Sequence, residues 1–133
     1  FTAALHTYLA VREVEESRLE GLHGFSFRDK TDANRIKRDS GDVLLIEGET
    51  DRVYHDVQRP VLLREYDRSL GINADGFPDV VVWNPWIERS AAIADLPDDA
   101  FRHMLCVEAA AAQRPVRLAP GESWWGRQTL VAL

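Results

Sequence analysis

Short apolar segments, separated by turn-forming residues, recur along the whole chain and restrict its fold more than any other feature. They are rich in valine, leucine and aromatic residues and follow one another at intervals of about 8–12 residues, which is typical of the strands of a β-sandwich or β-barrel. We therefore predict an all-β fold. The expected strands cover residues 4–11, 24–28, 43–47, 53–57, 61–66, 79–84, 104–112 and 128–133.

The segments between these strands carry turn chemistry and little helix. Residues 73–78 combine Asn, Asp, Gly and Pro, residues 119–122 contain Pro and Gly, and the polar stretch 29–42 is expected to be a loop. Residues 87–94 could form one or two helical turns, and residues 97–101 a short helical turn that starts with acidic side chains. Segment 104–112 is ambiguous, because its alanines favour helix whereas Leu105-Cys106-Val107 favours strand, and we interpret it as a strand.

Length and charge restrict the class of protein. A chain of 133 residues forms one domain at most, and it has no run of about 20 apolar residues, which a membrane-spanning helix would need. The first residues lack a basic region and a small-residue cleavage site, so no signal peptide is expected. The net charge of −6 argues against a nucleic-acid partner. A small anionic ligand stays compatible with it, because a local basic pocket can outweigh a weak global field.

The cysteine and histidine residues indicate the redox state of the compartment and whether a metal site is expected. Cys106 is the only cysteine, so no intrachain disulfide can form, and a reducing, cytoplasmic compartment fits. His6, His23, His55 and His103 are scattered without the spacing of metal ligands, so we expect no tetrahedral zinc site.

Glu108 is the most unusual titratable residue. It lies in an apolar run and has no charged neighbour between His103 and Gln113. Burying a carboxylate costs several kcal/mol unless something compensates it. In a strand, Glu108 would share one face with Met104, Cys106 and Ala110. It could be a working carboxylate, or only a side chain at a sheet edge or in an arginine salt bridge.

His6 raises the same question. Within a strand it shares a face with Ala4, Tyr8 and Ala10, so small neighbours leave room beside the imidazole and Tyr8 provides an aromatic wall. The alternative is a histidine hydrogen-bonded in the core. The other three histidines lie among polar residues and are expected to be solvated.

Segment 49–54 (ETDRVY) places three charges just before a strand. Asp51 could cap a turn, or it could bind sugar hydroxyls together with Arg52. Trp83 and Trp86 offer flat apolar surface for a sugar ring, although strand-end tryptophans also serve as core packing. The basic residues between 28 and 38 are interleaved with aspartates, and we interpret them as a solvated loop rather than a phosphate site.

Four stretches in register resemble one known family. The stretches are ALHTY (4–8), ETDRVY (49–54), VWNPW (82–86) and CVE (106–108). In order and spacing they resemble the hexose-6-phosphate mutarotases (glucose-6-phosphate 1-epimerases) of the aldose 1-epimerase superfamily. The resemblance implies a galactose mutarotase-like β-supersandwich with a sugar site on a concave face. It further implies that residues 1–133 correspond to the C-terminal part of one such domain, and that these residues alone would fold incompletely.

The resemblance also implies the roles of particular residues. His6 and Glu108 resemble the catalytic pair that opens and closes the sugar ring, and Asp51 resembles a residue that binds sugar hydroxyls. The implied reaction interconverts the α and β anomers of a hexose 6-phosphate and requires no cofactor and no metal. The implied partner is a sugar phosphate, bound by a protein that is monomeric when complete, and the main phosphate-binding arginines are expected outside this chain.

Three other functions stay open. One is an aldose 1-epimerase that acts on unphosphorylated hexoses. Another is a carbohydrate-binding β-sandwich without catalysis, which would keep Asp51 and the tryptophans but would not need Glu108. The third is a structural or regulatory homologue.

Overall fold

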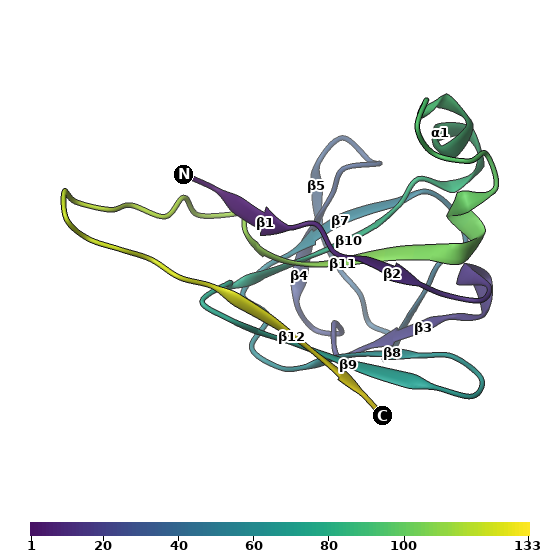
Figure 1. Ribbon diagram of the computed structural model, residues 1–133, viewed down its shortest axis with the longest axis horizontal. Helices are drawn as coiled ribbons and strands as arrows, with labels where there is room; N and C mark the ends of the chain where they lie inside the picture. The colour runs from purple at the N-terminus through teal and green to yellow at the C-terminus, as the bar shows by residue number, and fades with distance from the viewer.

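The computed structural model describes all of residues 1–133 and consists of two antiparallel β-sheets that share one core (Figure 1). The all-β prediction is therefore confirmed. Two short 3₁₀ helices and one α-helix connect strands at the ends of the sheets.

The larger sheet has seven strands and contains the candidate catalytic residues. Its order is β1-β11-β10-β7-β4-β5, and β2 also pairs with β11 beyond the end of β1. The strands are β1 (Ala3–Leu5), β2 (Tyr8–Ala10), β4 (Ser26–Asp29), β5 (Arg35–Arg38), β7 (Thr50–Tyr54), β10 (Asp79–Asn84) and β11 (Met104–Ala111).

The smaller sheet has five strands in the order β12-β9-β8-β3-β6. These are β3 (Arg18–Glu20), β6 (Val43–Leu45), β8 (Val61–Arg64), β9 (Ser69–Asp75) and β12 (Arg127–Ala132). The helical segments are η1 (Val14–Glu16), α1 (Trp86–Ala92) and η2 (Ala100–His103). None of the helices is long and apolar enough to cross a membrane.

Most of the expected strands are present, but β3 and β9 were not predicted, and three other expectations need correction. The predicted strand 4–11 is interrupted at His6 and Thr7, which separates β1 from β2. The predicted loop 29–42 contains β5, because its charged residues alternate between the two faces of a hairpin with β4. The turn expected at 73–78 starts later, since β9 continues to Asp75. The uncertain segment 104–112 is a strand, as predicted.

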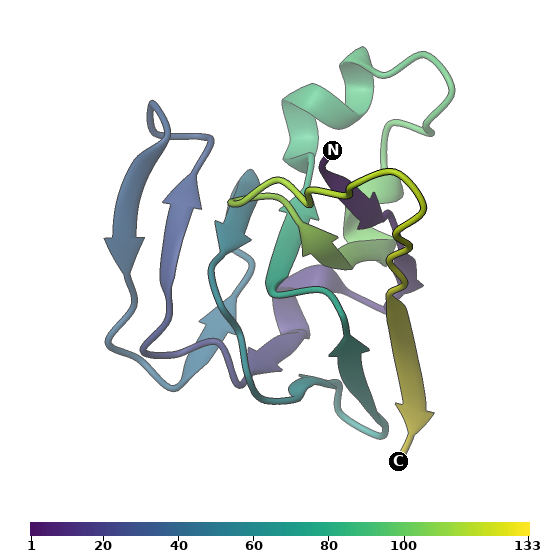
Figure 2. The ribbon, with the colours of Figure 1, turned by 90° about the vertical axis from the view of Figure 1, so that its left-hand side faces the viewer.

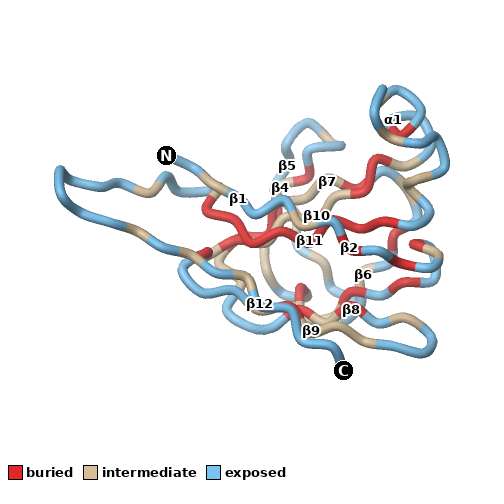
Figure 3. The backbone as a smooth tube through the Cα atoms, viewed as in Figure 1, coloured by how far each residue is buried: buried red, intermediate tan, exposed pale blue.

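The core lies between the two sheets. Phe27, Tyr54, Val82, Leu105 and Val107 of the larger sheet pack with Leu19, Val61, Leu63 and Ile72 of the smaller one. All eight residues of β11 are buried, and Figure 3 shows this buried stretch running through the middle of the molecule. β11 has a strand on each side, and it is the only strand of the larger sheet in which every residue is buried.

Side chains of the larger sheet that point away from the core form a second, open face. Successive residues of a strand point to opposite faces, and residues paired across strands share a face. Since Val82 and Val107 face the core, their neighbours Val81, Trp83, Cys106 and Glu108 face the other way. The candidate functional residues lie on this open face.

Candidate active site

The register of β1 and β2 on β11 places His6 beside Glu108. Leu5 of β1 pairs with Ala109, and Tyr8 of β2 pairs with Cys106, so the two unpaired residues His6 and Thr7 stand opposite Glu108 and Val107. Residues directly opposite each other on antiparallel strands share a face, so the side chains of His6 and Glu108 are neighbours on the open face.

Gln128 supports the interruption from the smaller sheet. The Thr7 hydroxyl donates to Oε1 of Gln128 at 2.6 Å, and Nε2 of Gln128 donates to the Val107 carbonyl at 2.9 Å. The Thr7 amide bonds back to the Leu5 carbonyl at 2.8 Å. Polar groups that would otherwise belong to the β-ladder are thus satisfied, as buried backbone groups must be.

His6 and Glu108 form an ion pair at the floor of the open face. Nδ1 of His6 lies 3.1 Å from Oε1 of Glu108, and the side chain of Glu108 is 7% exposed whereas that of His6 is 55% exposed. Because Nδ1 is engaged by the carboxylate, Nε2 is the ring nitrogen left for a bound molecule. The pair joins a sequestered carboxylate to an accessible imidazole.

Two aromatic rings hold the imidazole in place. Tyr8 stacks on His6 with ring centroids 4.8 Å apart and planes 6° from parallel. Trp83 meets His6 edge to face at 5.7 Å and 87°, and it meets Tyr8 in the same way. With the ion pair, these contacts restrict the ring to one orientation.

The pair opens into a cleft of about 450 Å³. Asp51 and Lys30 lie on its far wall, two and three strands away from β11, and Val53 and Val81 form the floor between them and Glu108. The near wall carries only small side chains, Ala3, Ala4, Ala110 and Ala112. This volume suits a monosaccharide better than a polymer.

The charges in the cleft act on one another. Burial raises the pKa of Glu108, and the negative charge of Asp51 adds to this rise, while His6 and Lys30 oppose it. Burial likewise raises the pKa of Asp51 against the opposing charges of Lys30 and Arg89. A carboxylate with a raised pKa is a stronger base than an exposed one, which suits proton abstraction.

Cys106 lies next to the pair. Its sulfur and ligand atoms of His6 and Glu108 lie within 4.8 Å of one another, so these three residues could offer ligands to a metal ion. Burial, and then the charge of Glu108, raises the pKa of the Cys106 thiol. A metal ion would have to displace this proton, because thiolates and not thiols are metal ligands. The geometry is that of a proton-transfer pair with a protonated thiol beside it.

The structure gathers His6, Glu108 and Asp51 in one cleft, and it corrects two of the sequence-based alternatives. Glu108 is not at a sheet edge, and its partner is His6 rather than an arginine. Arg52 points to the opposite face from Asp51, where it donates to Asp39 at 2.9 Å and to the Tyr54 hydroxyl.

Asp51 belongs to β7 and so does not cap a turn. The remaining candidates lie outside the cleft. Asn84 is fully buried and donates to the carbonyls of Phe101 and Met104, and Trp86 packs on Phe101. His55 is buried, contrary to the solvated position expected for it.

Sequence reasoning missed Lys30, because its relation to Asp51 depends on pairing between β4 and β7. It also missed Gln128, whose contact with Thr7 depends on the packing of the two sheets.

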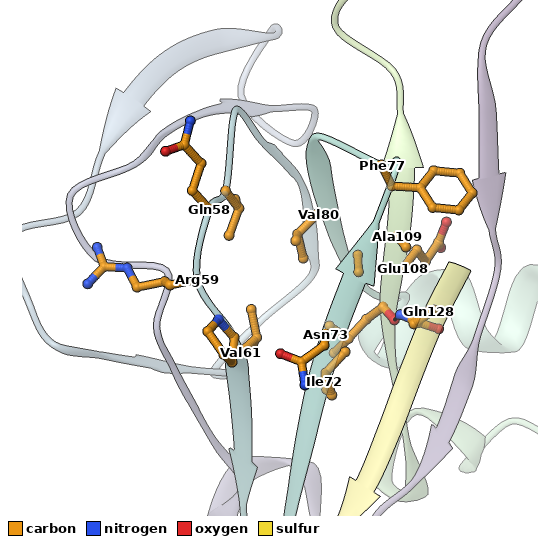
Figure 4. Close-up of a pocket in the computed structure, with 14 residues that line it drawn as sticks. Gln58, Arg59, Val61, Ile72, Asn73, Phe77, Val80, Glu108, Ala109 and Gln128 are labelled. Atoms are coloured by element: carbon orange, nitrogen blue, oxygen red, sulfur yellow. Dashed lines mark hydrogen bonds between the residues drawn. The ribbon is translucent and has the colours of Figure 1, made fainter. Parts of the chain in front are cut away.

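A second cavity, of about 170 Å³, lies between the sheets (Figure 4). Figure 4 shows Ile72 and Asn73 of β9, Gln128 of β12 and Val80 of β10 around it. Glu108 borders both cavities because β11 separates them. The inter-sheet cavity holds no acid–base pair, so the open cleft is the candidate active site.

Comparisons with known proteins agree with this geometry. Residues 1–130 match the family model described as aldose 1-epimerase. A relative from Cenchrus ciliaris is 36% identical over the whole chain, and one from Escherichia coli is 31% identical over 82% of it; both carry the name "Putative glucose-6-phosphate 1-epimerase". The chain spans 41% and 37% of the lengths of these two relatives.

The fold has a counterpart among solved structures. A crystal structure from Salmonella typhimurium, described as "a putative mutarotase (YeaD)", superimposes with a TM-score of 0.92 at 26% identity. The superposition covers 98% of this chain and 45% of that one.

Proposed function

Because the chain belongs to the aldose 1-epimerase family, we propose that its protein interconverts the α and β anomers of a hexose 6-phosphate, with Glu108 as general base and His6 as general acid. The observation that carries the proposal is the pair between the buried carboxylate and the accessible imidazole, 3.1 Å apart at the floor of a monosaccharide-sized cleft. The names of the relatives favour glucose 6-phosphate over free glucose.

The reaction needs two proton transfers at one end of the sugar. Glu108 accepts the proton of the C1 hydroxyl while His6, through Nε2, donates a proton to the ring oxygen. The bond between C1 and the ring oxygen breaks, and the C1 aldehyde forms. After rotation about the C1–C2 bond, the C5 hydroxyl attacks the other face of the aldehyde, and both protons return. Positioned acid and base groups each contribute about 10²–10⁴-fold in rate.

Asp51 has a binding role in this scheme. It lies across the floor from Glu108, where its carboxylate can accept hydrogen bonds from sugar hydroxyls remote from C1. Trp83 lines the cleft and braces His6.

We further propose that residues 1–133 are the C-terminal part of a single mutarotase-like domain. The two curated relatives are more than twice as long as the segment they share with this chain, which supports this assignment. We propose a monomeric cytoplasmic protein, for which the single buried cysteine is suited.

The test is anomer exchange in the intact protein. Exchange spectroscopy by NMR on equilibrated glucose 6-phosphate, with glucose alongside, should show enzyme-dependent exchange that is faster for the phosphate. Equal exchange for both sugars would assign the protein to free hexoses. Sugar binding without any exchange would make it a carbohydrate-binding protein.

A further inference from the structure

The β4–β5 hairpin separates its basic residues by face. Arg35 and Lys37 point to the core side of the larger sheet, where Asp29 and Asp32 pair with them at 2.8–3.8 Å. Arg28, Lys30 and Arg38 point to the open face, and none of these three takes part in an ion pair. We name these three residues the cationic patch.

The sheet register aligns the cationic patch with the catalytic pair across the strands of the larger sheet. Glu108 pairs with Val81, Val81 with Val53, and Val53 with Arg28, so all four share the open face. Lys30 follows Arg28 on the same face, and its amide donates to the Asp51 carbonyl at 2.9 Å. Figure 2 shows β4 and β5 at the outer edge of the larger sheet, away from β11.

The distance between the catalytic pair and the cationic patch fits a phosphorylated sugar. Three strand spacings, about 14 Å, separate the backbones of Glu108 and Arg28. A hexose ring with its C6 phosphoryl group, together with the reach of an extended arginine or lysine side chain, spans such a separation. Val53 and Val81 leave an uncharged floor between the two ends.

Arg28 has a buried hydrogen-bond donor without a partner. Its Nε is buried and has no hydrogen-bond partner, although guanidinium groups in protein interiors are normally paired. In a chain whose net charge is −6, three unpaired cations on one face form a local field that attracts an anion. Arginine is also suited to bind a phosphoryl group through two parallel hydrogen bonds.

We propose that Arg28 and Lys30, with Arg38 at the rim, bind the phosphoryl group of the substrate and determine the preference for sugar phosphates. The inference rests on the proposed function and adds residues of this chain to phosphate recognition, whose main arginines the family resemblance places outside this chain. Lys30 also faces Asp51, so one side chain connects the hydroxyl-binding and phosphoryl-binding parts of the cleft.

The test compares substrates in variants of the intact protein. Arg28→Gln and Lys30→Gln should each lower the ratio of kcat/KM for glucose 6-phosphate to kcat/KM for glucose by at least about tenfold. Arg35→Gln is the matched control, because Arg35 is a cation of the same hairpin on the opposite face, and it should leave the ratio unchanged. An unchanged ratio in Arg28→Gln and Lys30→Gln would overturn the inference while the proposed function stands.

A binding measurement separates this inference from the activity. Inorganic phosphate, titrated by calorimetry, should bind the wild-type protein and the Arg35→Gln variant and bind Lys30→Gln at least about tenfold more weakly. Lys30 is exposed, so this variant should fold even if Arg28→Gln does not. Equal phosphate binding by wild type and Lys30→Gln would refute the subsite even if neither sugar is turned over.

Discussion

Glu108 occupies a position that a carboxylate rarely tolerates. It is buried on a central strand, and its pKa is raised by burial, yet its one ion-pair partner is an accessible imidazole. A side chain kept only for stability would be replaced by an apolar one at little cost, because buried ion pairs seldom add net stability. The arrangement therefore favours a chemical role.

Glu108→Gln keeps the shape of the side chain and removes its basicity. In the intact protein we expect kcat for anomerisation to fall by at least about 10²-fold, equal to about 2.7 kcal/mol of barrier, while sugar binding largely survives. His6→Asn should cause a comparable loss, and the double variant should be little worse than either, because the two groups act as a unit. Polarimetry measures the rates, and a thermal melt of the same samples confirms folding.

The wild-type pH profile provides the control. Glu108 must be ionised to act as a base, and its raised pKa means that activity is lost below a pH higher than the ordinary carboxylate value of 4.5. A near-normal kcat in folded Glu108→Gln, with the same acid limb, would end the proposed mechanism.

The β4–β5 hairpin depends on a buried acid on its core-side face. Asp29 accepts hydrogen bonds from the Thr31 hydroxyl and amide and from Lys37, at 2.6–2.9 Å. Burial alone would raise the pKa of Asp29, but these hydrogen bonds outweigh it and lower the pKa to about 2 from 3.8. The hairpin is thus held by a network on one face while the cations of its other face stay free.

Asp29→Asn should lower the free energy of unfolding at pH 7 by about 1–2 kcal/mol. Because the pKa of Asp29 is lower in the folded state, its contribution is complete above about pH 4 and is lost as the pH falls towards about 2. Urea unfolding at several pH values should show the difference from wild type shrinking over that range.

Asp32→Asn is the control for the hairpin, since Asp32 also pairs with Lys37 but is 41% exposed. It should cost less than about 1 kcal/mol. Equal losses in both variants, or a loss in Asp29→Asn that does not depend on pH, would contradict the assignment to the buried network.

The two sheets share a single core, so the cleft and the smaller sheet should unfold together. Leu19 of β3 is 1% exposed and packs in the core from the sheet that lacks His6 and Glu108. Leu19→Ala should cost about 2–5 kcal/mol through the cavity that it leaves, without changing kcat below the transition.

Unfolding followed by tryptophan fluorescence and by residual activity should give one coincident transition, shifted to lower denaturant in Leu19→Ala. Separate transitions, with activity retained after the smaller sheet has unfolded, would show that the sheets are independent units.

Local sequence was sufficient to predict those strands and candidate residues that could be identified without knowing which strands pair. The run Asp79–Asn84 is apolar and ends at Pro85, so its strand was predicted with the bounds that the structure has. Glu108 was identified by its apolar surroundings, and its face on β11 followed from strand alternation. His6 was singled out by its apolar neighbours and Asp51 by the charges that precede a strand, and their roles came from the family resemblance.

Tertiary structure alone decided how these residues meet. His6 meets Glu108 because β1 and β2 pair with β11, and Gln128 of the smaller sheet bonds to Thr7 and to the Val107 carbonyl, contacts that no local pattern encodes. The free cations of the hairpin were indistinguishable from the paired ones in sequence, because pairing depends on the face to which each points. Strand register between segments far apart in the chain brings His6, Asp51 and Glu108 into one cleft, and register is set by the burial of whole sheets rather than by any single stretch.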